Sequence, residues 1–182
     1  MAYNQYLITK FDPQYRDSHG CYTRNEWTDI SDIGKEFEGK VFTALEYLET
    51  ESNYVNVLNY LMKICDVTCF TVSGLEKHKS NDWNPQIYTQ AQHNTFDLID
   101  EGKKFTDETV IDAFRLCLRG DIFCRFYSQN DHFVFHADGE MYFHIICREL
   151  SKEEVNTIRN LGLKEVIQYF CEWKDKQQYC TL

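Results

Sequence analysis

The stretch that decides the fold is Ile122–Cys147, IFCRFYSQNDHFVFHADGEMYFHIIC. It contains three short apolar runs, which Ser128–Asp131 and Ala137–Glu140 separate. An Asp-Gly pair between two runs of alternating polarity is a strong hairpin signal. The stretch therefore predicts a three-stranded antiparallel meander over residues 122–147.

The turns of this meander determine which side chains share a face. We expect two-residue turns at 129–130 and 138–139, which place Val134 opposite Phe143. One face then holds core side chains: Ile122, Cys124, Phe126, Phe133, Phe135, Tyr142, His144 and Ile146. The other face is mixed and carries Phe123, Arg125, Tyr127, His132, Val134, His136, Met141, Phe143 and Ile145.

Signals along the rest of the chain predict a single α+β domain over residues 1–182, with helices covering one face of an antiparallel sheet. Strands are expected at 3–11, 66–73 and 95–99. Helices are expected over 43–64, with a possible break near 50–53, from Thr106 to Gly120, and from Ser151 to Gly162. Residues 163–173 fit helix and strand alike, and we favour a helix.

Composition and charge narrow the classes of function. Hydrophobic residues make up 43% of the 182 residues and aromatic residues 15%, which indicates an ordered core. The formal net charge is −10, so the chain is not an obvious binder of duplex nucleic acid, which needs Lys and Arg contacts. The same charge suits a basic protein partner, although it also serves solubility alone.

Cofactor and metal motifs are missing from the sequence. Eight cysteines occur, but there is no Cys-x-x-Cys pair, and Cys65 and Cys69 lack further ligands at zinc-site spacing. There is no phosphate-cradling glycine loop and no Rossmann fingerprint. We therefore expect no cofactor and no metal. No signal peptide precedes Met1 and no apolar run is long enough to span a membrane, so we expect a cytoplasmic protein.

The mixed face of the meander holds the candidate catalytic residues Arg125, Tyr127, His132 and His136. On a strand, His132 and His136 lie roughly 13 Å apart, too far to share one metal ion or phosphate. Tyr127 beside His132 could act as an acid–base pair, with Arg125 binding a phosphate. The alternative is that a helix half-buries these side chains, whose role is then structural.

A second polar cluster lies in the early loop. Its members are Asp17, His19, Glu26, Asp29 and Asp32. Their spacing matches neither a calcium loop nor a zinc protease motif. We expect these carboxylates to cap turns, with Ser31 or Asp32 starting a short helical turn.

Residues 6–37, YLITKFDPQYRDSHGCYTRNEWTDISDIGKEF, resemble the N-terminal signature of small bacterial proteins carried on genomic and mobile elements. With its size and acidity, the chain resembles the type II-A anti-CRISPR proteins, which are phage-encoded inhibitors of the RNA-guided effector nuclease. The resemblance implies that the protein blocks the basic nucleic-acid channel, blocks guide loading, or attacks the guide RNA. Such inhibitors share no motif, so the resemblance assigns no functional residue.

Two further functions fit the same residues. An immunity protein that neutralises a basic nuclease toxin would use the same electrostatics. A small metal-independent ribonuclease acting on guide RNA would use the mixed face of the meander. We expect an inhibitory binding protein in the cytoplasm of a bacterial host, whose partner is a basic nucleic-acid-handling protein such as a type II CRISPR effector, with or without guide RNA. Guide-RNA cleavage remains the enzymatic alternative.

Overall fold

The chain builds one large sheet, one small sheet and four helices within residues 4–78, 83–129 and 132–169, which the computed structural model describes. The strands are β1 (Asn4–Thr9), β2 (Glu36–Phe37), β3 (Lys40–Val41), β4 (Cys69–Lys77), β5 (Lys104–Thr106), β6 (Ile122–Ser128), β7 (Val134–Ala137), β8 (Tyr142–Cys147) and β9 (Glu165–Tyr169). The helices are α1 (Ala44–Ile64), α2 (Gln90–Leu98), α3 (Asp107–Leu118) and α4 (Lys152–Asn160).

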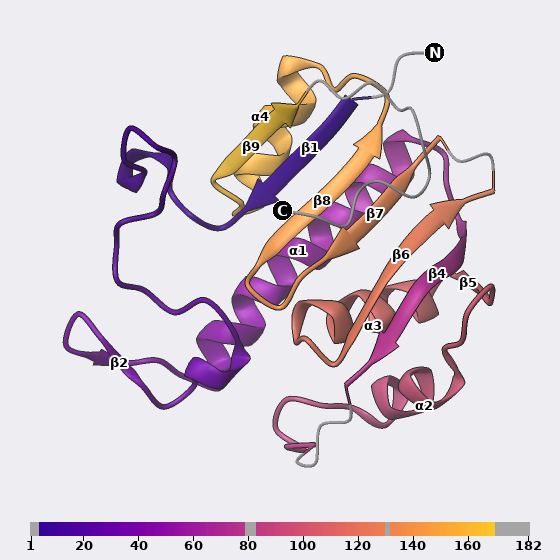
Figure 1. The fold of residues 1–182 in the computed structure, drawn as a ribbon, viewed down its shortest axis with the longest axis horizontal. Coiled ribbons are helices and arrows are strands. Elements are labelled where there is room, and N and C mark those ends of the chain that lie inside the picture. Colours follow the sequence, from indigo (N-terminus) through magenta and orange to yellow (C-terminus); the bar gives the residue numbers. More distant parts are fainter. Residues whose placement is uncertain (1–3, 79–82, 130–131, 170–182) are drawn as a thin grey trace.

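The large sheet is antiparallel and has the strand order β5-β4-β6-β7-β8-β1-β9. The meander β6-β7-β8 lies at its centre (Figure 1). β1 pairs with β8 on one side and with β9 on the other, so the first and last strands lie together at one side of the sheet. The sheet thus joins segments from the whole described chain.

The helices lie on one side of the large sheet, where α1, α3 and α4 run behind the strands in the view of Figure 1. Their apolar sides bury the inward row of the strands, which includes Tyr6, Phe70, Phe126, Phe135 and Phe143. Alternate residues of a strand point to opposite faces, so the side chains between these face away from the helices. No helix in the described segments is long and apolar enough to cross a membrane.

A buried charge cluster ties three of the helices together. Glu51 on α1 is fully buried and accepts two hydrogen bonds from Arg119 on α3, of 2.7 and 2.8 Å, and another from Arg115. Arg119 also donates to the side-chain oxygen of Gln92 on α2 at 2.8 Å. Buried charges are tolerated only when they are paired, so this cluster specifies how α1, α2 and α3 pack.

Residues 12–43 extend from the end of β1 to the start of α1, at the left of Figure 1, and are pinned by aromatic and charged side chains. Trp27 stacks on Phe42 with ring centroids 4.2 Å apart, and the Lys10 ammonium lies 3.9 Å from the Trp27 ring. Arg16 binds the buried carboxylate of Glu165 on β9 at 2.5–3.0 Å. The segment is therefore an ordered part of the protein.

The predicted fold class is confirmed: an antiparallel sheet that includes the meander is covered on one face by helices. The capping boxes at Thr43/Glu46 and Ser151/Glu154 begin α1 and α4, as predicted. α1 runs without a break to Ile64.

Two predicted elements were wrong. The strand expected at 95–99 is helix, because Thr89 and Gln92 form a capping box that starts α2. The helix favoured for 163–173 is strand β9 over Glu165–Tyr169, which pairs with the outer edge of β1; residues 170–173 lie outside the described segments. In both places tertiary contacts and caps outweighed local propensity.

The expected register of the β7–β8 hairpin was also wrong. Ala137 pairs with Phe143 and His136 with His144, which leaves a longer turn than the expected two residues. Met141, rather than Gly139, adopts a left-handed conformation, with φ 63°. Phe143, Ile145 and Cys147 therefore face the core, and Tyr142, His144 and Ile146 face the open side, the reverse of the prediction. The predicted β6–β7 register was wrong by two residues. Because this number is even, each side chain of β6 and β7 still lies on the predicted face of the sheet.

Close packing against Gly120 explains why a glycine occupies position 139. A Cβ added there would lie 3.3 Å from the Cα of Gly120, so the turn passes directly over the end of α3. The carboxylate of Asp138 shapes the turn by accepting the backbone N–H groups of Glu140 (3.1 Å) and Tyr142 (3.0 Å). The Asp-Gly pair therefore marks a hairpin, but not a type I′ turn.

Candidate functional site

The candidate site is the open face of the large sheet, the face turned away from the helices. The register places Ser73 beside Arg125, and His136 beside His144. Because Phe126 pairs with Phe135, the preceding Arg125 lies next to His136. A row of polar side chains therefore crosses β4, β6, β7 and β8.

Two histidines form the centre of this row. The rings of His136 and His144 stack with centroids 4.5 Å apart and planes 1° apart. Burial, together with the neighbouring His144 and Arg125, lowers the pKa of His136 to about 3. Burial also lowers the pKa of His144. Both imidazoles are therefore neutral at pH 7, when each can accept one hydrogen bond and donate another.

Asp138 stands at the end of the histidine pair. One carboxylate oxygen lies 4.0 Å from Nε2 of His144. Burial raises the pKa of Asp138 to about 6, against the lowering effect of the backbone N–H groups that it accepts. At pH 7 the two imidazoles are therefore neutral, whereas Asp138, whose pKa is about 6, is mostly ionised and carries a negative charge.

Of the four predicted site residues, the structure brings Arg125, Tyr127 and His136 to the open face. His132 lies in the bend before β7 and is half-exposed, and Tyr127 pairs with Val134 instead of with His132. The described helices do not cover these side chains. The prediction missed His144, because the expected hairpin register turned it toward the core; its place beside His136 follows from the longer turn.

Three of the early-loop carboxylates, Asp17, Asp29 and Asp32, cap turns as expected, whereas Glu26 accepts a hydrogen bond from the Tyr22 hydroxyl. The helical turn starts at Ile30 rather than at Ser31 or Asp32. Asp17 accepts the backbone N–H groups of His19 and Cys21, and Asp29 caps the 3₁₀ turn Ile30–Asp32. Asp32 is buried and binds Lys35 at 2.7 Å. Within the described residues, no group of three or more His, Cys, Asp or Glu side chains could hold a metal ion.

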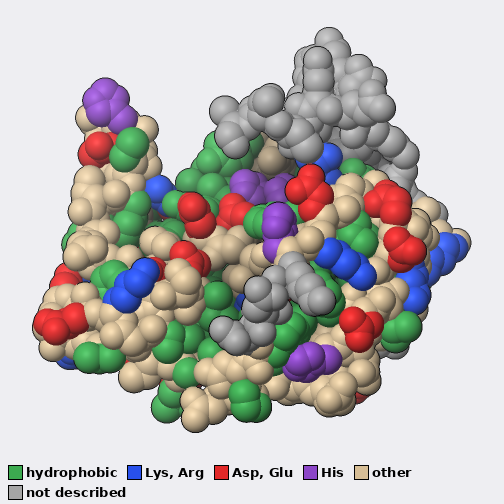
Figure 2. Space-filling view, turned by 60° about the horizontal axis from the view of Figure 1, so that its bottom comes forward, with side chains coloured by type: hydrophobic (Ala, Val, Ile, Leu, Met, Phe, Trp, Pro, Cys, Tyr) green, Lys and Arg blue, Asp and Glu red, His purple; other side chains and the backbone are tan. Residues whose placement is uncertain are grey.

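Many basic side chains of the protein form ion pairs with carboxylates of the same chain. Acidic and basic side chains are interspersed on the face seen in Figure 2. Many of the cations are engaged in ion pairs with carboxylates: Lys10, Arg16, Arg24, Lys35, Arg115, Arg119, Arg148 and Lys164. Many exposed carboxylates have no ion-pair partner within the described part of the chain, among them Asp17, Glu36, Glu49, Asp66, Asp97, Asp100, Glu140, Glu149 and Glu153.

Two of these carboxylates lie beside exposed apolar side chains near the start of α1. Val41 and Leu45 are 58% and 66% exposed, which is unusual for large aliphatic residues. Glu36 pairs with Val41 across the β2–β3 hairpin, and Glu49 lies one helical turn after Leu45. We call these four residues the acidic–apolar surface.

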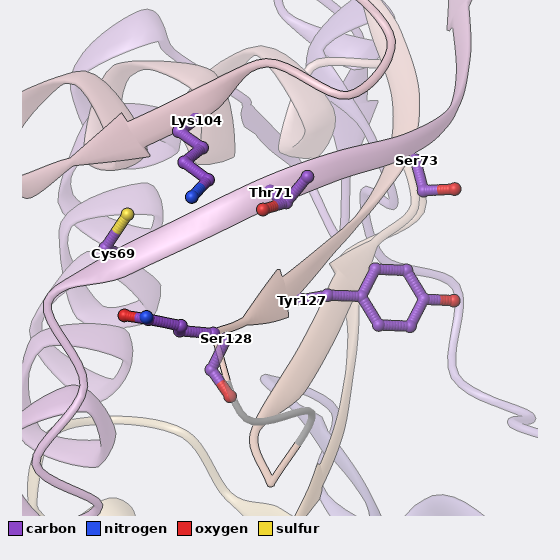
Figure 3. A pocket seen from close by; sticks show the side chains of 7 residues that line it. Cys69, Thr71, Ser73, Lys104, Tyr127 and Ser128 are labelled. Carbon is purple, nitrogen blue, oxygen red and sulfur yellow. The ribbon is translucent and has the colours of Figure 1, made fainter.

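A pocket of about 350 Å³ opens on the same sheet face, between β5, β4 and the end of β6 (Figure 3). Thr71 pairs with Lys104 on one side and with Tyr127 on the other, so these three side chains form one row in its wall. Gln129 and Ser73 also line it. No acidic residue lines the pocket among the described residues.

No family model, curated protein or solved structure matches the chain. The site is therefore interpreted from its own geometry: a polar row with a neutral histidine pair, an adjoining pocket, and a separate surface of carboxylates beside aliphatic side chains.

Proposed function

We propose that the protein is an inhibitory binding protein that docks on a basic, nucleic-acid-handling protein, and that this partner is a type II RNA-guided nuclease. The observation that carries the proposal is the acidic–apolar surface, in a protein with 29 acidic against 19 basic side chains, eight of which pair with carboxylates of the same chain. Unpaired carboxylates steer association with a basic groove, and exposed aliphatic side chains supply buried contact area.

The histidine pair favours binding over ribonuclease chemistry. Cleavage of RNA by a pair of histidines needs one imidazole to be protonated near neutral pH, so that it can act as the general acid. The lowered pKa values of His136 and His144 leave both imidazoles neutral under these conditions. This supports a mode in which the protein occupies the nucleic-acid channel of the nuclease or blocks guide loading.

The test is binding to the purified nuclease, with and without guide RNA, at several salt concentrations. We expect binding that weakens as salt rises, because screening acts on exposed charges. The double variant Glu36→Lys/Glu49→Lys should lose about tenfold or more in affinity, since it places like charges against the partner. Glu149→Lys/Glu153→Lys is the matched control: it changes the net charge equally at the start of α4 and should lose far less.

Three outcomes would change the assignment. Absence of binding to the nuclease at low salt, in both guide states, would remove the proposal. Binding to a basic nuclease toxin in place of the RNA-guided nuclease would assign the role of an immunity protein. Shortened guide RNA on a gel, in the presence of nuclease and this protein, would show that cleavage contributes.

A further inference from the structure

We propose that the pocket between β5, β4 and β6 binds a nucleotide, with its phosphate at Lys104 and its base against the ring of Tyr127. This inference does not rest on the proposed function and is tested on the protein alone. It assigns a ligand to a cavity that the acidic–apolar surface does not include.

The pocket is a cation-bearing site in an acidic protein. Lys104 is exposed and has no ion-pair partner among the described residues, whereas many other cations of the chain are paired. Figure 3 shows its ammonium group directed toward β4, between Cys69 and Thr71. No described carboxylate lines the pocket itself, although Glu101 contacts the lining Ser73, and Lys104 supplies a positive charge that attracts an anion.

The spacing of the row suits a phosphate at one end and a ring at the other. Lys104, Thr71 and Tyr127 stand on three neighbouring strands, which are roughly 4.8 Å apart, so the ends of the row are separated by roughly 10 Å. The hydroxyl of Thr71 lies between them as a donor for a phosphate or sugar oxygen. Bases of any sequence stack on aromatic side chains, which assigns the base to Tyr127.

The remaining lining groups add polar contacts. Gln129 carries an amide that can both donate and accept, as the edge of a base requires. Ser73 interacts with the carboxylate of Glu101, which also accepts the N–H groups of Gly74 and Leu75 and is thereby held in place. The volume of about 350 Å³ lies within the range of small-ligand sites.

The experiment titrates the full chain with 5′-mononucleotides, with a single-stranded RNA hexamer and with inorganic phosphate. We expect saturable binding of nucleotides that is tighter than binding of phosphate. Lys104→Ala should weaken nucleotide binding by about tenfold and Lys104→Arg should retain it, because the loss is that of one charge-assisted contact. Tyr127→Leu should weaken nucleotide binding by about tenfold and leave phosphate binding unchanged.

Lys152→Ala, which removes an exposed lysine on α4, is the matched control and should bind as the wild type does. Thermal unfolding of each variant establishes that it is folded. A hexamer that binds much more tightly than mononucleotides identifies RNA as the source of the nucleotide, whereas equal affinities identify the free nucleotide. The proposal fails if none of the probes binds, if phosphate binds as tightly as nucleotides, or if Lys152→Ala and Lys104→Ala lose affinity equally.

Discussion

His136 and His144 stack face to face across β7 and β8, with ring centroids 4.5 Å apart and planes 1° apart. Such contact suits two neutral imidazoles, because two positive charges at this distance would repel one another. The stacking of this pair on the open sheet face therefore favours the neutral form of both side chains.

The first prediction follows from this pair. Burial lowers the folded-state pKa of His136 from 6.5 to about 3, so the unfolded chain takes up the proton more readily in that window. Stability is therefore present above pH 6.5 and is lost as the pH falls toward 3. At pH 5 the loss is roughly 1–2 kcal/mol, since one pKa unit corresponds to about 1.4 kcal/mol.

Urea unfolding at pH 7, 6 and 5 measures this loss, and His136→Gln should remove it. His19→Gln, at an exposed position in the early loop, is the control and should behave like the wild type. Asp138 and Asp121, whose pKa values are raised to about 6 by burial, change stability in the opposite direction, but they are present in every variant. An undiminished loss in His136→Gln would contradict the assignment.

The sequence predicted the β7–β8 hairpin but not the face of β8. The alternating pattern of residues 122–147 was sufficient to predict the meander, because apolar residues at every second position indicate a β-strand with one buried face. The face of β8 depended on the turn length, since a shift by an odd number of residues inverts every side chain of a strand. The contact of Gly139 with Gly120 and the left-handed conformation of Met141 are tertiary features, which local turn rules do not contain.

The other elements also differ in whether a local sequence signal announces them. α1 and α4 were predicted because capping boxes and apolar stripes coincide. α2 has an equally good capping box at Thr89, which was a readable signal that the prediction passed over. β9 and the pocket row could not be predicted, because they arise from the pairing of strands that are far apart in the sequence.

The second prediction concerns the buried charge cluster. Glu51→Ala leaves Arg115 and Arg119 without their carboxylate partner, and breaking a buried pair from one side costs about 3–5 kcal/mol. Glu49→Ala, two residues earlier on the exposed side of α1, should change the free energy of unfolding by less than about 0.5 kcal/mol. Urea denaturation compares the two variants, and equal effects would mean that the cluster contributes no specific stability.

The third prediction concerns the early loop. Arg16→Ala removes the guanidinium that binds Glu165, which is only 6% exposed, so the loop loses its anchor to β9 and the carboxylate is left buried. We expect destabilisation of about 3 kcal/mol and faster proteolysis within residues 12–28. Arg24→Ala is the control, because its partner Glu38 is exposed and such a pair contributes little. Cleavage at the wild-type rate in Arg16→Ala would show that aromatic packing alone holds the loop.

The fourth prediction asks whether the open sheet face belongs to the contact surface for the nuclease. His132 is half-exposed in the bend before β7, so His132→Ala should leave the melting temperature within about 2 °C of the wild type. If the face contacts the partner, this variant and Arg125→Ala lower inhibition of the nuclease. Lys63→Ala, at an exposed position on α1, is the matched control and keeps full inhibition.

A fall in melting temperature together with inhibition would instead give Arg125 a structural role, because it shares its row with Ser73 and the histidine pair. Unchanged inhibition in stable His132→Ala and Arg125→Ala variants would restrict docking to the acidic–apolar surface. The sheet face would then be free in the complex, and nucleotide binding at Lys104 and Tyr127 should persist when the nuclease is bound. Titration of the assembled complex with mononucleotides measures that persistence, and competition between nuclease and nucleotide would place both on the same face.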